Sequence, residues 1–290
     1  METKQDSRNK LSAGSYDLNK FLSGGYDKDI ITTLYGPPGC GKTNFCMLAA
    51  ASLAKKDQKV IFIDTEGGFS IERLRQLIGK SNQSNKEENK DNYEKILSNI
   101  LLLKPTNFTE QSESFSKLLK ELKQDNNKRI ALIIVDGMTM LYRLELAEAR
   151  KENIGESESD ESDDKKNKEK YEKDQEKARV EKYKRISDIN SKLANQMRLL
   201  AEIARKENIA VITTNQVYSE FLSEEELKAG REKQVNMVGG DIMKYWSKCI
   251  IEIKNKNSKR TAILRKHRSL PEKELQFDIV NEGIRKRGWL

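Results

Sequence analysis

The stretch Gly36-Pro37-Pro38-Gly39-Cys40-Gly41-Lys42-Thr43 decides the fold of this 290-residue chain. An apolar run at residues 30–35 precedes it, and a helix-forming run at 44–50 follows. A glycine-rich loop between a strand and a helix presents backbone N–H groups to a phosphate. In such a loop the lysine reaches the β and γ oxygens and the hydroxyl residue holds Mg²⁺. We therefore expect all eight residues to bind a nucleotide, with Lys42 at the phosphates and Thr43 at the metal.

Apolar runs at residues 59–64, 130–135 and 209–214 alternate with helix-like segments. Such nearly continuous runs are typical of parallel strands that are buried on both faces. Residues 249–253, 261–264 and 275–280 read as further strands around a polar turn. The predicted fold class is α/β: a mostly parallel twisted sheet flanked by helices, with a C-terminal antiparallel extension.

We expect one domain at residues 11–290 after a flexible arm at 1–10, with an exposed polar loop at 81–95. A charged insertion occupies about residues 148–185. Residues 152–164 hold seven acids and no base, and residues 165–185 hold ten bases against five acids. This composition favours either disorder or an isolated charged helix over the second half. Both readings treat the segment as an insertion into one loop.

Composition excludes several classes of protein. Three scattered cysteines (Cys40, Cys46 and Cys249) and a single histidine, His267, provide neither a disulfide framework nor a zinc site. The sequence has no apolar segment long enough for a signal peptide or a membrane span, so we expect a cytoplasmic protein without a membrane partner. The net charge of +8 suits a phosphate-bearing partner, but equally a lysine-rich soluble protein.

Polar residues stand where three predicted strands end, which is the edge that carries the ligand in open α/β sheets. Asp136 is a candidate second Mg²⁺ carboxylate. Glu66 is a candidate base that polarises the attacking water, or else a carboxylate at a helix start. Gln216 is a candidate sensor of the γ-phosphate, or else a turn residue.

The order of these motifs resembles the RecA/RadA recombinase ATPases, and most of all the RadB proteins of archaea. The similarity runs from Leu11 to Ile284 apart from the charged insertion. The stretches that carry it are 15–25, 36–43, Phe62-Ile63-Asp64-Thr65-Glu66-Gly67-Gly68-Phe69, Ile133-Ile134-Val135-Asp136, Thr214-Asn215-Gln216-Val217, Gly239-Gly240-Asp241 and Lys266-His267-Arg268-Ser269-Leu270-Pro271. The resemblance implies a RecA-like core that binds ATP and Mg²⁺, with Lys42, Glu66 and Gln216 as catalytic residues and with Thr43 and Asp136 at the metal.

In that superfamily two loops face DNA, and the resemblance assigns them here to about residues 143–185 and 217–238. The second loop offers Tyr218 and Phe221 for stacking on bases, and Arg231 and Lys233 for phosphates. It also holds five acids against three bases, unlike a strongly cationic DNA loop. Residues 248–290, with twelve bases against five acids, are a competing surface, and a solvated lysine-rich face is the plain alternative.

The resemblance also suggests that Lys266 and Arg268 act on the γ-phosphate of a neighbouring subunit. Structural salt bridges are the alternative for both residues. Only about ten polar residues precede the core, so we expect neither a separate DNA-binding domain nor a filament.

The favoured hypothesis is a Mg²⁺-dependent ATPase with weak turnover that binds single- or double-stranded DNA and assists homologous recombination and repair, together with a RadA-type recombinase or other recombination proteins. The second hypothesis is an ATP-binding mediator with negligible hydrolysis. A third is a RecA-core ATPase of the signalling kind that ignores DNA.

Overall fold

A computed structural model describes residues 9–79, 93–124, 130–151, 165–219 and 235–288. Its main sheet has nine strands in the order β13-β12-β11-β10-β3-β7-β6-β4-β5. The parallel part is β10 (Ser247–Lys256), β3 (Ile31–Tyr35), β7 (Ala210–Asn215), β6 (Ile130–Asp136), β4 (Lys59–Asp64) and β5 (Ile100–Leu103). The strands β11 (Lys259–Lys266), β12 (Lys273–Val280) and β13 (Gly283–Lys286) extend the sheet antiparallel from β10. The predicted fold class is confirmed.

The apolar runs form central strands because both faces of the sheet are buried. Side chains alternate between two hydrophobic clusters, as a pleated strand requires. In β4, Phe62 points into one cluster, and Ile61 and Ile63 point into the other. Polar residues therefore collect where the strands end.

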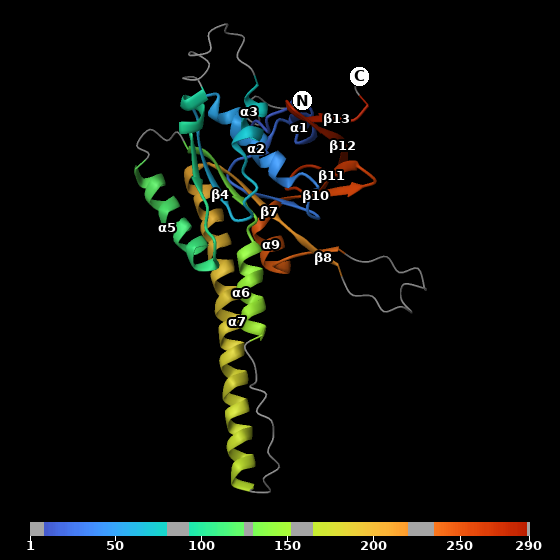
Figure 1. Ribbon diagram of the computed structural model, residues 1–290. Coiled ribbons are helices and arrows are strands. Elements are labelled where there is room, and N and C mark those ends of the chain that lie inside the picture. Colours follow the sequence, from blue (N-terminus) through green and yellow to red (C-terminus); the bar gives the residue numbers. More distant parts are fainter. Residues whose placement is uncertain (1–8, 80–92, 125–129, 152–164, 220–234, 289–290) are drawn as a thin grey trace.

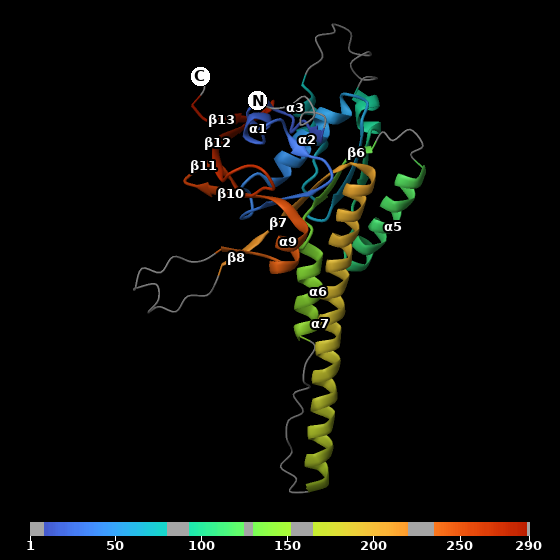
Figure 2. The same ribbon diagram turned by 180° about the vertical axis from the view of Figure 1, so that it is seen from behind.

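Helices cover the two faces of the sheet (Figures 1 and 2). On one side lie α1 (Tyr16–Phe21), α2 (Lys42–Ala54) and α3 (Ile71–Ile78). Residues 45–51 of helix α2 are all buried, because the helix packs on α3 and against the strands β4, β6 and β13. On the other side lie α5 (Phe108–Gln124), α6 (Met140–Lys151), α7 (Lys165–Glu207) and α9 (Gly240–Trp246).

Two boundaries differ from the sequence prediction. Lys10, expected in the flexible arm, belongs to β1 (Lys10–Leu11), which pairs with β2 (Tyr26–Asp27). Its ammonium lies 3.2 Å from the buried Asp27 carboxylate, which fixes this end of the chain. The last residues of the predicted polar loop, 93–95, begin a short helical segment, and residues 80–92 of that loop lie outside the described residues.

The second half of the charged insertion is helical, which is one of the two alternatives left open for residues 165–185. It forms the start of α7, whose 43 residues span about 64 Å. The N-terminal part of α7 projects from the body and extends beyond the end of α6 (Figures 1 and 2). Residues 152–164 lie outside the described part. Among the helices that the structure describes, none is long and apolar enough to cross a membrane, α7 included.

Candidate nucleotide site

The glycine-rich loop lies between β3 and α2, at the carboxyl edge of the parallel strands. A Cβ atom on Gly36 would stand 2.1 Å from the Ile253 carbonyl oxygen, so only glycine fits against β10 there. Gly41 caps α2 with φ of 115°, a conformation that residues with a side chain rarely adopt. The first N–H groups of α2 therefore open into the loop, which is the geometry of an anion site.

Lys42 is buried, and its ammonium turns back into the loop. Its Nζ donates hydrogen bonds to the carbonyl oxygens of Gly36 at 2.9 Å and Pro37 at 3.0 Å. The ammonium is thus held against the backbone of the loop by two carbonyl oxygens, which a phosphate oxygen would replace. Cys40, also buried, lies 3.9 Å away, and burial raises the pKa of its thiol.

Asp136 ends β6 as predicted, fully buried at the same edge. Its Oδ1 accepts a hydrogen bond from the Thr214 hydroxyl at 2.6 Å. Its Oδ2 has no hydrogen-bond partner of normal geometry among the described residues. A Cβ built on Gly68 would lie 3.6 Å from this Oδ2 and 3.2 Å from the Thr43 hydroxyl oxygen, so both oxygens border one small space. A buried carboxylate oxygen without a donor, beside a hydroxyl, fits a Mg²⁺ ion.

Burial raises the pKa of Asp136 to about 6. The hydroxyls of Thr214 and Thr43 lower it, and the carboxylates of Glu66 and Asp64 raise it again. Ionisation of this group is therefore costly without a cation, and a divalent ion would recover the cost.

Glu66 and Gln216 meet above this carboxylate. The Gln216 amide Nε2 donates to Glu66 Oε1 at 3.2 Å, joining residues that are 150 positions apart in the chain. Gly137 makes this approach possible, because a Cβ at that position would lie 2.3 Å from Thr65 Oγ1 and 2.6 Å from Glu66 Cγ. The predicted base and the predicted sensor thus form one exposed pair at the edge that holds Asp136.

Gln216 continues directly into a two-stranded ribbon of β8 (Val217–Ser219) and β9 (Val235–Met237). Its neighbour Asn215 is fully buried and donates from Nδ2 to the Val238 carbonyl at 2.6 Å, so the ribbon is fixed to the strand end. Tyr218, a predicted DNA contact, lies on β8 and is 48% exposed. The other predicted contacts, Phe221, Arg231 and Lys233, lie outside the described residues.

Lys266 and Arg268 lie at the opposite edge of the sheet from the phosphate loop. Lys266 ends β11 and pairs with Ile250, near the start of the parallel strand β10. Arg268 is held by Asp27 and Asp29, with three N–O distances of 3.0 Å. Neither cation can therefore reach the phosphate loop of its own chain, and their action on a neighbour stays a prediction.

Sequence reasoning missed two contributors. Thr214 lay within a quoted motif without a role, yet its hydroxyl both donates to Asp136 and accepts from the Gly137 N–H at 2.7 Å. Arg73 on α3 binds Asn44 in the first turn of α2 through Nε at 2.8 Å, and the Val280 carbonyl through Nη2 at 2.8 Å. Only the fold brings these partners together, so periodicity carries no signal for either residue.

The Rad51 family model matches residues 4–156 and 179–287 of the sequence. The chain belongs to the Rad51 family. Among curated relatives, the DNA repair and recombination protein RadB of Methanocaldococcus jannaschii is 35% identical over 267 residues, 92% of this chain and 98% of that protein. The proteins of the same name from Methanobrevibacter smithii and Methanosphaera stadtmanae are 33% and 32% identical, over 92% and 98% of this chain and 92% and 100% of theirs.

The Rad51 match has one gap, at residues 157–178. It coincides with the part of the insertion that includes the projecting end of α7. The Rad51 match includes the phosphate loop and the three residues Asp136, Glu66 and Gln216. Residues 157–178 are therefore an addition to the family core, and the site belongs to that core. Together with the exposed residues 179–181 of α7 they are called the arm.

Proposed function

We propose that the chain is a Mg²⁺-dependent ATPase of low turnover that binds DNA and assists homologous recombination and repair. Membership of the Rad51 family and the similarity to proteins named RadB support the recombination role. The observation that carries the ATPase role is the Glu66–Gln216 pair beside Asp136 and the phosphate loop. These groups have the chemistry needed to bind a triphosphate, orient water and report the γ-phosphate.

In this proposal the loop N–H groups and Lys42 bind the phosphates, and Thr43 and Asp136 hold Mg²⁺. The ion, when bound, neutralises charge that develops on the transferring phosphoryl group. Glu66 orients and polarises water, and Gln216 holds the Glu66 carboxylate in place. Strand β8 begins at Val217, directly after Gln216, so loss of the Gln216 hydrogen bond to Glu66 would displace the start of β8.

Lys42→Ala tests the site itself. The variant should lose ATP binding in calorimetry, because the ammonium held against the loop is gone, yet keep its circular dichroism spectrum. The control is Lys55→Ala at the far end of α2, which removes a lysine whose ammonium donates to the Leu77 carbonyl at 3.2 Å, away from the phosphate loop. Undiminished ATP binding by Lys42→Ala would refute the assignment.

Glu66→Gln separates an ATPase from a mediator with negligible hydrolysis. Glutamine keeps an oxygen that accepts from Gln216 but is no base, so binding should persist while turnover falls by about 100-fold or more. Turnover is measured with and without single-stranded DNA. A wild-type rate no higher than that of Glu66→Gln would favour the mediator.

The position of Lys266 and Arg268 favours slow hydrolysis, whether the protein acts as an ATPase or as a mediator. Lys266 and Arg268 lie at the far sheet edge, so they cannot place a second cation on the γ-phosphate of their own chain. Without such a cation, charge on the transferring group is stabilised mainly by Lys42 and Mg²⁺. We therefore expect DNA or a protein partner to raise the rate.

A further inference from the structure

Two buried glutamine side chains connect the metal-binding strand to the long helix α7. Gln111 on α5 is 0% exposed, and its Nε2 donates to the Met138 carbonyl at 3.1 Å and to Gln196 Oε1 at 2.8 Å. Gln196 on α7 in turn donates from Nε2 to the Ser112 hydroxyl at 2.9 Å. Buried amides are costly unless they are bonded, so this pair ties α5, α7 and residue 138 into one unit.

Met138 lies in the turn between Asp136 and the start of α6. The same turn is bonded from the other side, because the Met138 N–H donates to the Thr214 carbonyl at 3.0 Å and the Thr139 hydroxyl donates to Asn215. Any shift of the Asp136 carboxylate toward a metal must therefore pull on Thr214 and Asn215 and on the glutamine pair together.

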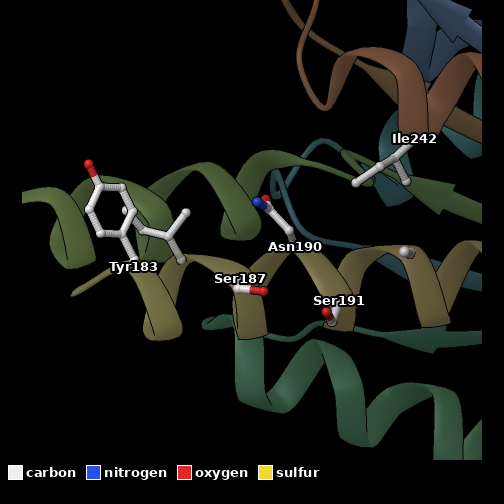
Figure 3. Close-up of a pocket in the computed structure, with 7 residues that line it drawn as sticks. Tyr183, Ser187, Asn190, Ser191 and Ile242 are labelled. Carbon is white, nitrogen blue, oxygen red and sulfur yellow. The ribbon is translucent and has the colours of Figure 1, made fainter. Parts of the chain in front are cut away.

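Because helix α7 is 43 residues long, a small rotation near Gln196 would move its distant end by a larger distance. Helix α6 runs antiparallel beside it, joined by Tyr142 to Asn190 at 2.7 Å and by Arg185 to Glu145 at 3.5 Å. On its side toward α9, which packs against α7, an open groove of about 370 Å³ is lined by residues that include Tyr183, Asn190 and Ile242 (Figure 3). The bonds between α6 and α7 would let the two helices tilt as one body, and the groove leaves open surface between Asn190 and Ile242 for a small displacement.

We propose that Gln111 and Gln196 are positioning residues that couple the occupancy of the Mg²⁺–nucleotide site to the tilt of the α6–α7 pair. The proposal rests on the proposed function, because it needs nucleotide at Asp136. Gln111 Oε1 is buried without a partner among the described residues, so the pair has a spare acceptor for a second arrangement. An element with two bonded arrangements is what a coupled switch requires.

The tilt is measurable along the arm. Lys177 is exposed and lies 19 residues before Gln196, about 28 Å along the helix, so a tilt of about 10° moves it by about 5 Å. Spin labels at Lys177→Cys and at the exposed Glu274→Cys on β12 report this distance by pulsed electron resonance. The native cysteines are buried at 0–2% exposure, so labelling is selective (Cys40, Cys46 and Cys249).

The labelled protein is measured alone and with saturating Mg²⁺ and a non-hydrolysable ATP analogue, and analogue binding is followed by calorimetry. We expect a distance change in the parent that Gln111→Met and Gln196→Met each abolish while the analogue still binds. The double variant should behave like either single one, because both break the same connection. Tyr142→Phe, which also loses one hydrogen bond on α7 but leaves the turn intact, should keep the change.

An unchanged distance in the parent with the analogue bound would overturn the proposal. So would a change that persists in both methionine variants, or one that Tyr142→Phe abolishes equally. Failure of the parent to bind the analogue would instead refute the proposed function, which keeps the two results distinct.

Discussion

At the scale of single residues, the site depends on one carboxylate that burial makes hard to ionise. Asp136 is enclosed at the end of β6 with Asp64 and Glu66 nearby, and only hydroxyls offset the burial. Its pKa of about 6 means that the folded chain binds a proton there more tightly than the unfolded chain does. Protonation of Asp136 therefore stabilises the fold, and ionisation costs stability until a cation arrives.

Asp136→Asn should make the metal-free protein more stable at pH 8 by up to about 3 kcal/mol. The sign follows from linkage: wild-type stability falls as pH rises from about 4 through about 6, while asparagine does not titrate. Urea unfolding at pH 4 and pH 8 tests this. An equal difference at both pH values would contradict the assigned pKa, and Mg²⁺ with nucleotide should stabilise only the wild type.

At the scale of elements, the turns after the strands decide where the side chains meet. Asp64 accepts from the N–H groups of Gly68 at 3.1 Å and Phe69 at 3.0 Å, which shapes the segment that carries Glu66. Gly137, on the neighbouring strand end, lies against that segment. Packing between two turns thus positions the candidate base.

Gly137→Ala should displace Glu66 and lower stability by roughly 2–4 kcal/mol, because a Cβ atom collides with Thr65 and the φ of 91° is strained. Gly67→Ala is the matched control: its φ of 71° is also positive, but its Cβ meets nothing within 4 Å, so it should cost about 1 kcal/mol. Denaturant unfolding and ATP turnover measure both variants. Equal losses would show that backbone strain, and not the contact with Glu66, limits position 137.

The sequence was sufficient for elements with a strong local pattern. The central strands could be predicted from their continuous apolar runs, and with them the edge that gathers Asp136, Glu66 and Gln216. The edge strand β5 was not predicted, because Ile100–Leu103 is short and only partly buried. Thr214, Arg73 and Gln111 could not be predicted, because their partners come from distant elements. The sequence could not decide between a helix and disorder at residues 165–185, because a high density of charge is compatible with both.

At the scale of the whole molecule, a compact family core carries an added arm. In the part of the arm whose side chains are described, residues 173–181 of α7 are all exposed. Lys182, which follows these residues, donates a hydrogen bond to the Arg150 carbonyl near the end of α6 at 2.6 Å. The gap in the family match, at residues 157–178, ends just before this contact.

Replacement of residues 152–178 by a short glycine–serine linker should therefore leave the core folded. We expect the free energy of unfolding to change by no more than about 0.5 kcal/mol, because residues 173–178, the replaced residues whose side chains are described, are exposed and exposed residues contribute little. Helical circular dichroism should fall and ATP affinity should stay the same. Loss of cooperative unfolding would show that the arm is part of the core after all.

The order of the strands also has a consequence for how the protein is made. β3, which leads into the phosphate loop, pairs on one side with β7 and on the other with β10, and both are encoded more than 170 residues later. On the ribosome both edges of β3 stay unpaired until most of the chain has emerged, which exposes them to wrong partners. A chain that is cut short before β10 would thus lack a formed phosphate-loop site, however intact its glycine motif.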